Sequence, residues 1–362
     1  MFSGQTSVNM PQDIMISSDT EGIETDKLQA AVIGTGAISQ RLHIPAYLDS
    51  DYADLVAVCD VEEKKATAVA DSYGIESTYT DYEAMLDSGE VDAVSVCLPN
   101  HLHKDVVCGA LERDIHVLCE KPICTSLSEA DAMIEAADAS QAQLMIDQTE
   151  RFNPVYEKTN DLLEKGVVGD VLSVRSRFSH PGPEGWSPRS AWFTDADASG
   201  GGALIDIGIH NADLINYLFD DVASLSGYSD TLSMDTEVED TAVAALRFND
   251  GALGTFETAW RTDPESIEMQ IVGEEGVIYV DKVEPSIRLE LGNDCGSVDV
   301  PVPEQSKHGG PIQHFIESAR SGSEPTVTGR DGKQALEIVL AVYQSSESSE
   351  RVTLPLETEA QE

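Results

Sequence analysis

Basic residues are scarce in this chain of 362 residues. Lys and Arg together number 22 whereas Asp and Glu number 66, which gives a formal net charge of −44 at pH 7. Nucleic acids and anionic membranes attract proteins through basic patches, so neither is an expected partner. The acidic residues are spread through segments with hydrophobic periodicity, which places them on faces of folded elements. We interpret the charge as adaptation to a salt-rich cytoplasm, as in halophilic archaea, because molar salt screens the self-repulsion.

Long apolar runs and paired cysteines are also missing. The chain has no run of about 18 or more apolar residues and no basic-then-apolar pattern at its N-terminus, so neither a membrane span nor a secretory signal is expected. The six cysteines include no C-x-x-C pair, and four lie in or beside apolar, strand-like runs. These features favour a reducing compartment over a disulfide framework, and we expect a cytoplasmic protein.

The first half of the chain alternates short apolar strands with helices. Residues 1–26 are polar and are predicted to be a flexible leader outside the fold. Strands are predicted at 28–33, 55–59, 77–79, 93–98, 116–119 and 143–146, and helices at 62–73, 81–86, 104–112 and 127–137. This alternation is typical of an α/β fold with a doubly wound parallel sheet, so we predict a Rossmann dinucleotide-binding domain at 27–148. Its ligands would lie at the carboxyl ends of the strands.

The rhythm changes after about residue 150. The predicted elements are helices at 154–165, 205–219, 311–321 and 332–345, a strand at 172–178, and strands at 241–248, 254–259, 266–272, 276–280, 287–291 and 297–300. Strands that follow one another with few helices favour an antiparallel meander. We therefore predict a second α+β domain at 149–362, with a large, open, mostly antiparallel sheet that binds substrate and mediates oligomerisation. Packing of apolar strands such as 243–246 between subunits would give a homodimer or homotetramer.

A glycine-rich stretch marks the expected cofactor site. The pattern Gly34-x-Gly36-x-x-Ser39 follows a strand and opens a helix, so its backbone can approach a pyrophosphate, although Ser39 replaces the third glycine. Asp60 ends the next strand, where an acidic side chain reaches the adenosine ribose. Candidate cofactor contacts here are Gly34, Gly36, Ala37, Ile38 and Asp60. Asp60 would repel a 2′-phosphate and favours NAD, whereas Lys64 and Lys65 could compensate, so NADP stays open.

Four motifs together resemble the family of glucose–fructose oxidoreductase and inositol dehydrogenase, the Gfo/Idh/MocA-type NAD(P)-dependent oxidoreductases. They are Gly34-x-Gly36-x-x-Ser39, Asn100-x-x-His103, Glu120-Lys121-Pro122 and Gly201-Gly202-Ala-Leu-Ile-Asp206-x-Gly208-x-His210, in the family's order, and the resemblance runs from about Leu28 to the C-terminus. The resemblance implies that Lys121, Asp206 and His210 surround the reacting carbon and that the Lys121–Pro122 bond is cis. It also implies that Glu120 and the loop at Pro99 and Asn100 border the nicotinamide. His103 would contact the cofactor or simply stand in the first turn of a helix that Asn100 caps.

The chemistry of alcohol oxidation agrees with these residues. Hydride leaves for the nicotinamide while the hydroxyl loses its proton, and a histidine is a suitable base for that proton. Our hypothesis is that His210 is the base, that Lys121 polarises the substrate oxygen, and that Asp206 binds a hydroxyl or aligns the base. Asp206 and His210 are four residues apart and would share a helix face.

A long loop at residues 180–202 supplies candidate substrate contacts. Trp186, Arg189 and Trp192 suit the faces and hydroxyls of a sugar, although the tryptophans could equally pack a domain interface. Arg151 begins the second domain and could bind a substrate group or pair with an acidic residue. His101 and His103 have no further ligand at metal-binding spacing, so no metal is expected.

The predicted function is oxidation of a hydroxyl of a free sugar or polyol by an NAD(P)-dependent dehydrogenase. An Arg151-Phe-Asn-Pro154 segment also occurs in related sequences that act on nucleotide sugars, so a UDP-sugar 3-dehydrogenase is a narrower alternative. Reduction of an imine is also open. A third alternative is a non-catalytic nucleotide-binding sensor of the same fold, which would have no need of Lys121, Asp206 and His210 together.

Overall fold

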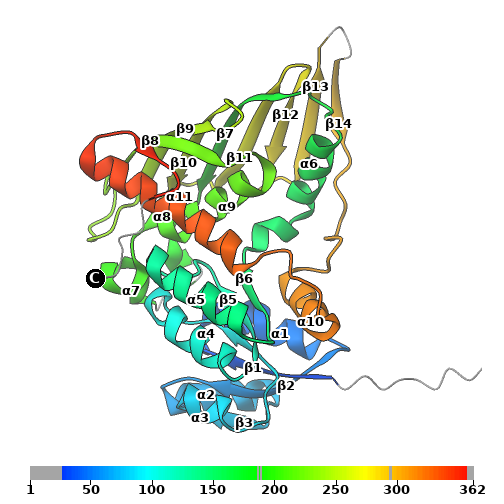
Figure 1. The fold of residues 1–362 in the computed structure, drawn as a ribbon, viewed down its shortest axis with the longest axis vertical. Coiled ribbons are helices and arrows are strands. Elements are labelled where there is room, and N and C mark those ends of the chain that lie inside the picture. The colour runs from blue at the N-terminus through cyan, green and yellow to red at the C-terminus, as the bar shows by residue number, and fades with distance from the viewer. Residues whose placement is uncertain (1–26, 186, 188–189, 293–295, 357–362) are drawn as a thin grey trace, which may run out of the picture.

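A computed structural model describes residues 27–356 except 186, 188–189 and 293–295, and within these residues the strands form two sheets (Figure 1). The first sheet has the order β3-β2-β1-β4-β5-β6 and every neighbouring pair is parallel. Its strands are β1 (Leu28–Ile33), β2 (Ala53–Cys59), β3 (Ser77–Tyr79), β4 (Ala93–Val96), β5 (His116–Glu120) and β6 (Leu144–Asp147). This is the Rossmann strand order, so the predicted doubly wound sheet is confirmed.

Helices connect the parallel strands, and all but the first lie at nearly the predicted positions. They are α1 (Ile44–Leu48), α2 (Glu63–Tyr73), α3 (Tyr82–Leu86), α4 (His103–Leu111) and α5 (Leu127–Ala139). Side chains cap two of them: Asp81 accepts a hydrogen bond from the Glu83 amide at the start of α3, and Ser126 does so from Glu129 at the start of α5. A π-helical turn, Ser39–His43, precedes α1 and turns the His43 side chain into the core.

The second sheet is mixed and has the order β14-β13-β12-β11-β7-β10-β9-β8-β15. Its strands are β7 (Val171–Ser179), β8 (Val222–Asp230), β9 (Thr241–Phe248), β10 (Leu253–Ala259), β11 (Ser266–Gly273), β12 (Gly276–Asp281), β13 (Ser286–Leu291), β14 (Gly296–Val300) and β15 (Val352–Thr353). The sheet is mostly antiparallel, as predicted. The simple meander is wrong, however, because β7 inserts between β11 and β10 and runs parallel to β10.

Helices cover one face of this sheet (Figure 1). The remaining helices are α6 (Pro154–Glu164), α7 (Ala196–Ser199), α8 (Ala203–Asp206), α9 (Gly208–Leu218), α10 (Pro311–Ser321) and α11 (Gly329–Ser348). Along β9 the side chains of Ala242, Ala244 and Leu246 are buried toward the helices, whereas Val243 is exposed on the opposite face. Helix α11 runs between the two sheets and contacts β8 and α9 on one side and α5 and β6 on the other (Figure 1).

Two further predictions need correction. The predicted helix at 205–219 is broken at Ile207 into α8 and α9, so Asp206 and His210 belong to successive helices. Strand β8 was not predicted, because its Ser, Gly and Asp residues weaken the apolar alternation that identifies a strand.

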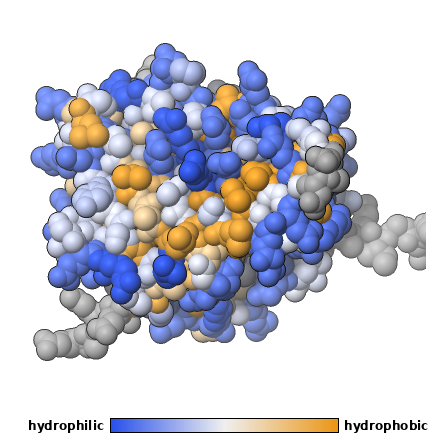
Figure 2. Space-filling model, turned by 90° about the horizontal axis from the view of Figure 1, so that it is seen from above, coloured by the Kyte–Doolittle hydropathy of each residue, from blue (hydrophilic) through white to orange (hydrophobic). Residues whose placement is uncertain are grey.

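The surface agrees with the acidic composition. Hydrophilic side chains dominate the face in Figure 2, and an irregular apolar area lies near its centre. No helix among the described residues is long and apolar enough to cross a membrane. The five described cysteines are free thiols, and Cys295 lies outside the described residues.

Candidate active site

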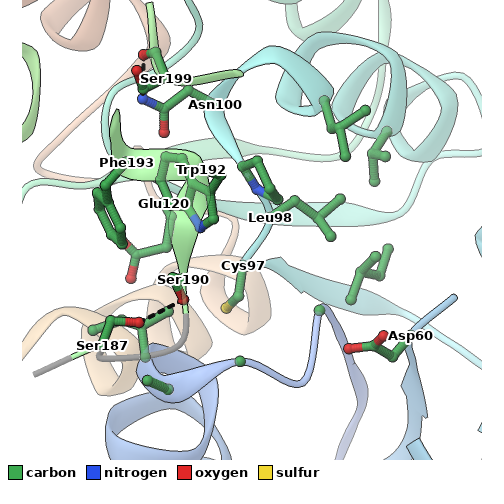
Figure 3. Close-up of a pocket in the computed structure, with 18 of the residues that line it drawn as sticks. Asp60, Cys97, Leu98, Asn100, Glu120, Ser187, Ser190, Trp192, Phe193 and Ser199 are labelled. Atoms are coloured by element: carbon green, nitrogen blue, oxygen red, sulfur yellow. Dashed lines mark hydrogen bonds between the residues drawn. The ribbon is translucent and has the colours of Figure 1, made fainter. Parts of the chain in front are cut away.

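One cavity of about 690 Å³ lies at the carboxyl edge of the parallel sheet. Strand ends and loops from the first sheet line one side of it, and Trp192, Phe193 and Asp206 come from the second half of the chain. Its size suits an organic cofactor together with a small substrate. In Figure 3, Asp60 lies toward one side of the cavity and Glu120, Trp192 and Phe193 lie toward the other.

The glycine-rich turn borders this cavity. Gly34 has a φ of +92°, and a Cβ there would lie 2.2 Å from the Cys97 carbonyl oxygen, so a side chain is excluded. A Cβ at Gly36 would meet nothing within 4 Å, which leaves its backbone open to a ligand. The predicted contacts Ala37 and Ile38 also line the cavity. These features fit the pyrophosphate of a dinucleotide.

Asp60 is fixed by its neighbours at the end of β2. Its Oδ2 accepts hydrogen bonds from the Thr35 amide at 3.0 Å and the Thr35 hydroxyl at 2.7 Å, and lies 3.1 Å from Lys65 Nζ. Although burial opposes the charged form, the Thr35 hydroxyl and the Glu62 amide lower the pKa of this carboxyl. The cavity therefore holds an ionised carboxylate where a ribose would bind, with a lysine beside it.

Lys121 and Asp206 meet across the cavity. Lys121 Nζ donates to the Asp206 carbonyl oxygen at 2.7 Å and lies 3.0 Å from Asp206 Oδ1. The Lys121–Pro122 peptide bond is cis, as the resemblance implies. Both side chains are largely buried and both residues line the cavity. The ammonium is thus held in a partly desolvated place, where it can act on a substrate oxygen.

His210 lies in the first turn of α9, near Lys121. Burial, followed by the positive charge of Lys121, lowers the pKa of His210 well below its usual value. Its Nδ1 has no hydrogen-bond partner among the described residues. His210 is not among the described residues that line the cavity. The imidazole is therefore neutral at pH 7, and its Nδ1 makes no hydrogen bond to a described residue. The side chain lies next to the cavity rather than in its lining.

Sequence reasoning missed two further neighbours of Asp206. Trp260 Nε1 donates to Asp206 Oδ2 at 3.1 Å, and His180 Nε2 lies 3.8 Å from the same oxygen. His180 follows β7 and Trp260 follows β10, and these strands are parallel neighbours. A parallel pairing of 171–179 with 253–259 would have placed both side chains at one sheet edge, but the expected meander hid it.

Asn100 and His103 take different places. Asn100 lines the cavity, and its side chain donates to the Ser199 carbonyl oxygen at 2.7 Å rather than capping a helix (Figure 3). His103 is fully buried, and its ring nitrogens lie 2.9 Å from the carbonyl oxygens of Pro122 and Leu98. His103 is therefore absent from the described cavity lining and holds the two flanking loops together. Pro99 and Glu120 line the cavity as expected.

The candidate substrate contacts divide in the same way. Trp192 lines the cavity and stacks on Phe193 with ring centroids 3.9 Å apart. Arg151 does not reach the described cavity, because its guanidinium is buried against Asp213 at 2.8 Å and Asp331 at 3.0 Å. Of the two alternatives for Arg151, the structure shows the pairing with acidic residues. Trp186 and Arg189 lie outside the described residues.

Two family models match this chain. Residues 28–148 match a model described as "Oxidoreductase family, NAD-binding Rossmann fold", and residues 156–279 match the GFO/IDH/MocA C-terminal domain. The chain belongs to the GFO/IDH/MocA family of oxidoreductases. The family and enzyme class predicted from the sequence are confirmed, as is a nicotinamide dinucleotide as cofactor.

Relatives of similar length cover most of this family member. A myo-inositol 2-dehydrogenase of Thermotoga maritima is 28% identical over 90% of this chain and 98% of its own. A D-xylose 1-dehydrogenase (NADP(+)) of Haloferax volcanii is 29% identical over 89% of this chain and 98% of its own. The WlbA dehydrogenase of Bordetella pertussis, solved with NADH and UDP-GlcNAcA, superposes with a TM-score of 0.82 at 28% identity, covering 91% of this chain and 100% of that one.

Proposed function

We propose that this family member oxidises a hydroxyl of a free sugar or polyol with NAD(P) as hydride acceptor. The observation that carries the proposal is the Lys121–Asp206 pair in the same cavity as Gly34, Gly36 and Asp60. The cavity thus joins a dinucleotide site to a buried ammonium. Relatives that act on inositol and on xylose support a hydroxylated substrate.

The proposed roles follow from charge and position. A bound nicotinamide supplies the hydride acceptor at its C4 atom. Lys121 donates a hydrogen bond to the substrate oxygen and stabilises the negative charge that develops there. We assign His210, which is neutral and lies beside the described cavity wall near Lys121, as the group that receives the hydroxyl proton. Asp206, held by Trp260 and Lys121, orients the ammonium and presents an oxygen to a neighbouring hydroxyl.

We propose NAD as the preferred cofactor. The ionised Asp60 would repel a 2′-phosphate, and Lys65 is already paired with that carboxylate at 3.1 Å. Relatives of both kinds exist: the Haloferax volcanii xylose dehydrogenase is named for NADP(+), and the WlbA dehydrogenase was solved with NADH. The preference of this protein for NAD over NADP therefore depends on the Asp60–Lys65 pair and does not follow from membership of the family.

A nucleotide-sugar substrate is the second candidate. The WlbA dehydrogenase was solved with UDP-GlcNAcA, which favours this alternative. Among the described lining residues the only Lys or Arg side chains are Lys65 and Lys121, and Arg151 is committed to Asp213 and Asp331. A second diphosphate would find little positive charge there, so we favour a free sugar or polyol.

We further propose that two copies pack through the face of the second sheet that no described helix covers. Tyr228, Val243 and Leu253 are each about half exposed or more. The register pairs Tyr228 with Val243 and Leu253 with Arg247, so these apolar side chains project from one face of β8, β9 and β10. Burial of such a face against a second copy would remove it from water.

Initial rates of nicotinamide reduction in molar KCl test the function. NAD and NADP would each be offered with a panel of aldoses, polyols and UDP-sugars. Turnover with a free sugar or polyol is the expected result. Turnover restricted to UDP-sugars would establish the second candidate. No turnover with any compound of the panel, together with tight cofactor binding, would contradict the proposal and favour a non-catalytic sensor.

A further inference from the structure

A buried cluster of ionisable side chains lies directly behind the cavity wall. His43 Nε2 is 3.0 Å from Glu120 Oε1 and 3.4 Å from Asp147 Oδ2, and His43 Nδ1 is 3.0 Å from Ser95 Oγ. His43 and Asp147 have no exposed surface, whereas Glu120 also lines the cavity (Figure 3). The cluster therefore links the core of the parallel sheet to the ligand site.

The sheet register explains why two carboxylates meet here. β5 and β6 end together, with Glu120 opposite Asp147 in the parallel ladder, so their side chains project from the same face. The π-helical turn at Ser39–His43 directs the imidazole onto both strand ends. Glu120 Oε2 in turn accepts the Lys121 amide at 3.2 Å, which ties the cluster to the residue proposed to act on substrate.

Asp147 is the unusual member of this cluster. Neither of its carboxylate oxygens has a hydrogen-bond partner among the described residues, although both are buried. A buried carboxylate without a hydrogen bond is unfavourable unless it shares a proton or pairs with a cation, and the His43 imidazole lies 3.4 Å away. Burial and then the charge of Glu120 raise the pKa of Asp147 to about 7. Burial opposes charge on His43 as well, but Cys97 and Glu120 raise the pKa of His43 well above its usual value.

We propose that His43, Glu120 and Asp147 share protons as one buried group, and that the charge of this group sets the relative affinity of the cavity for oxidised and reduced nicotinamide cofactor. The inference rests on the proposed dehydrogenase function of the cavity. His43 and Asp147 are positioning residues here, because they act through Glu120.

The direction of the effect follows from the charges. With Asp147 protonated, Glu120 ionised and His43 positive, the group is neutral; when Asp147 loses its proton, the group carries one negative charge. That charge stabilises the positive ring of the oxidised cofactor more than the neutral ring of the reduced form. The other titratable groups that face the cluster are Tyr47, Cys97, His103, Cys119 and Lys121. Burial raises the pKa of the Tyr47 phenol and of the Cys97 and Cys119 thiols and lowers that of His103, so none of these four gains charge near pH 7.

The test is the pH dependence of the two cofactor affinities, measured on the full chain without substrate. Dissociation constants for NAD⁺ and NADH would be determined by fluorescence and calorimetry in molar KCl between pH 5.5 and 8.5. We expect the ratio of the NADH constant to the NAD⁺ constant to rise with pH, on the order of 10-fold, with a midpoint near 7. Asp147→Asn should flatten this rise while leaving both cofactors bound.

A matched control and a second variant keep the test decisive. Glu337 is a half-buried carboxyl whose pKa burial also raises, but it lies outside the described cavity lining, so Glu337→Gln should retain the wild-type pH profile. If Asp147→Asn fails to fold, His43→Gln should move the midpoint to higher pH, because the two carboxyls then lack their cation. A pH-independent ratio in the wild type, an unchanged profile in Asp147→Asn or an unmoved midpoint in His43→Gln would overturn the inference. A metal ion bound in equimolar amount by the wild type and lost in Asp147→Asn would also overturn the inference, because the cluster would then be a metal site. Absence of any cofactor binding would instead count against the proposed function.

Discussion

Lys121 from the first half of the chain and Asp206 from the second are joined by a contact of 3.0 Å between Nζ and Oδ1. Lys121 directly follows the last residue of β5, and Asp206 ends α8, which packs against β9 and β10 of the second sheet. The ion pair therefore depends on both sheets being in place. Two described lysines line the cavity. Lys65 lies beside Asp60, so the ion pair with Asp206 positions Lys121, the lysine on the Glu120 side.

The pH profile of turnover should report His210. A base must be unprotonated to act, and burial together with Lys121 lowers the pKa of His210 well below 6.5. We therefore expect kcat/KM for the sugar or polyol, measured with NAD at saturation, to be flat near neutral pH and to fall only at pH values well below 6.5. His210→Asn should reduce turnover by roughly 100-fold or more and remove that acidic limb. An identical profile in this variant would exclude His210 as the base.

Replacement of Asp60 should change cofactor preference. Asp60→Asn removes the negative charge but keeps the size and an oxygen for the Thr35 amide. We expect the ratio of NADP to NAD affinity to increase by about 10-fold or more, because repulsion of the 2′-phosphate is lost and Lys65 is released. Equilibrium binding of both cofactors measures this ratio. Asp87→Asn, at an exposed surface ion pair with Arg113, is the matched control and should leave the ratio unchanged.

Arg151 should matter for stability rather than for substrate. Its side chain is almost fully buried against Asp213, whose pKa burial raises to about 6 despite the arginine. Arg151→Met would leave that carboxyl without its cation, which we expect to lower the free energy of unfolding by about 3–5 kcal/mol. When a carboxyl has a higher pKa in the folded than in the unfolded state, the free energy of unfolding falls as the pH rises. The variant should therefore be less stable at pH 8 than at pH 6. Denaturant unfolding of Arg151→Met and of the double variant with Asp213→Asn would show whether the second change restores stability.

The exposed apolar side chains on one face of β8, β9 and β10 predict self-association. Val243→Asp places a charge at the centre of the face formed with Tyr228 and Leu253, and should dissociate the proposed oligomer without unfolding the protein. Light scattering in high salt measures the mass of both forms. Leu48→Asp, at an exposed apolar position on α1 away from this face, is the control and should leave the mass unchanged. A wild-type chain that is monomeric at micromolar concentration would contradict the proposed interface.

Much of the first sheet could be predicted because its signals are local. Apolar strands that end at Gly34, Asp60 and Glu120 alternate with helices, and right-handed crossovers bring these ends to one edge. The same rule located Lys121. Helix and strand limits in this half differ from the sequence prediction by only a few residues, because caps such as Asp81 and Ser126 mark them.

Non-local pairing accounts for most of what was missed. His180 and Trp260 meet Asp206 only because β7 runs parallel to β10, and no local pattern specifies that pairing. The cluster of His43 with Asp147 depends on the register between β5 and β6 and on a π-helical turn, neither of which has a sequence signature. Arg151 was ambiguous for a related reason: its partner Asp213 lies 62 residues away along the chain.

Transfer of a labelled hydride in the wild type and in Lys121→Ala tests the central claim most directly. The sugar or polyol that the wild type turns over would be supplied with deuterium on the oxidised carbon, and the reduced nicotinamide would be analysed by mass spectrometry. We expect deuterium at the nicotinamide in the wild type, and a rate lowered by roughly 100- to 1,000-fold in Lys121→Ala with cofactor affinity retained. Reduced cofactor without deuterium, or a variant as fast as the wild type, would contradict a dehydrogenase whose chemistry depends on Lys121.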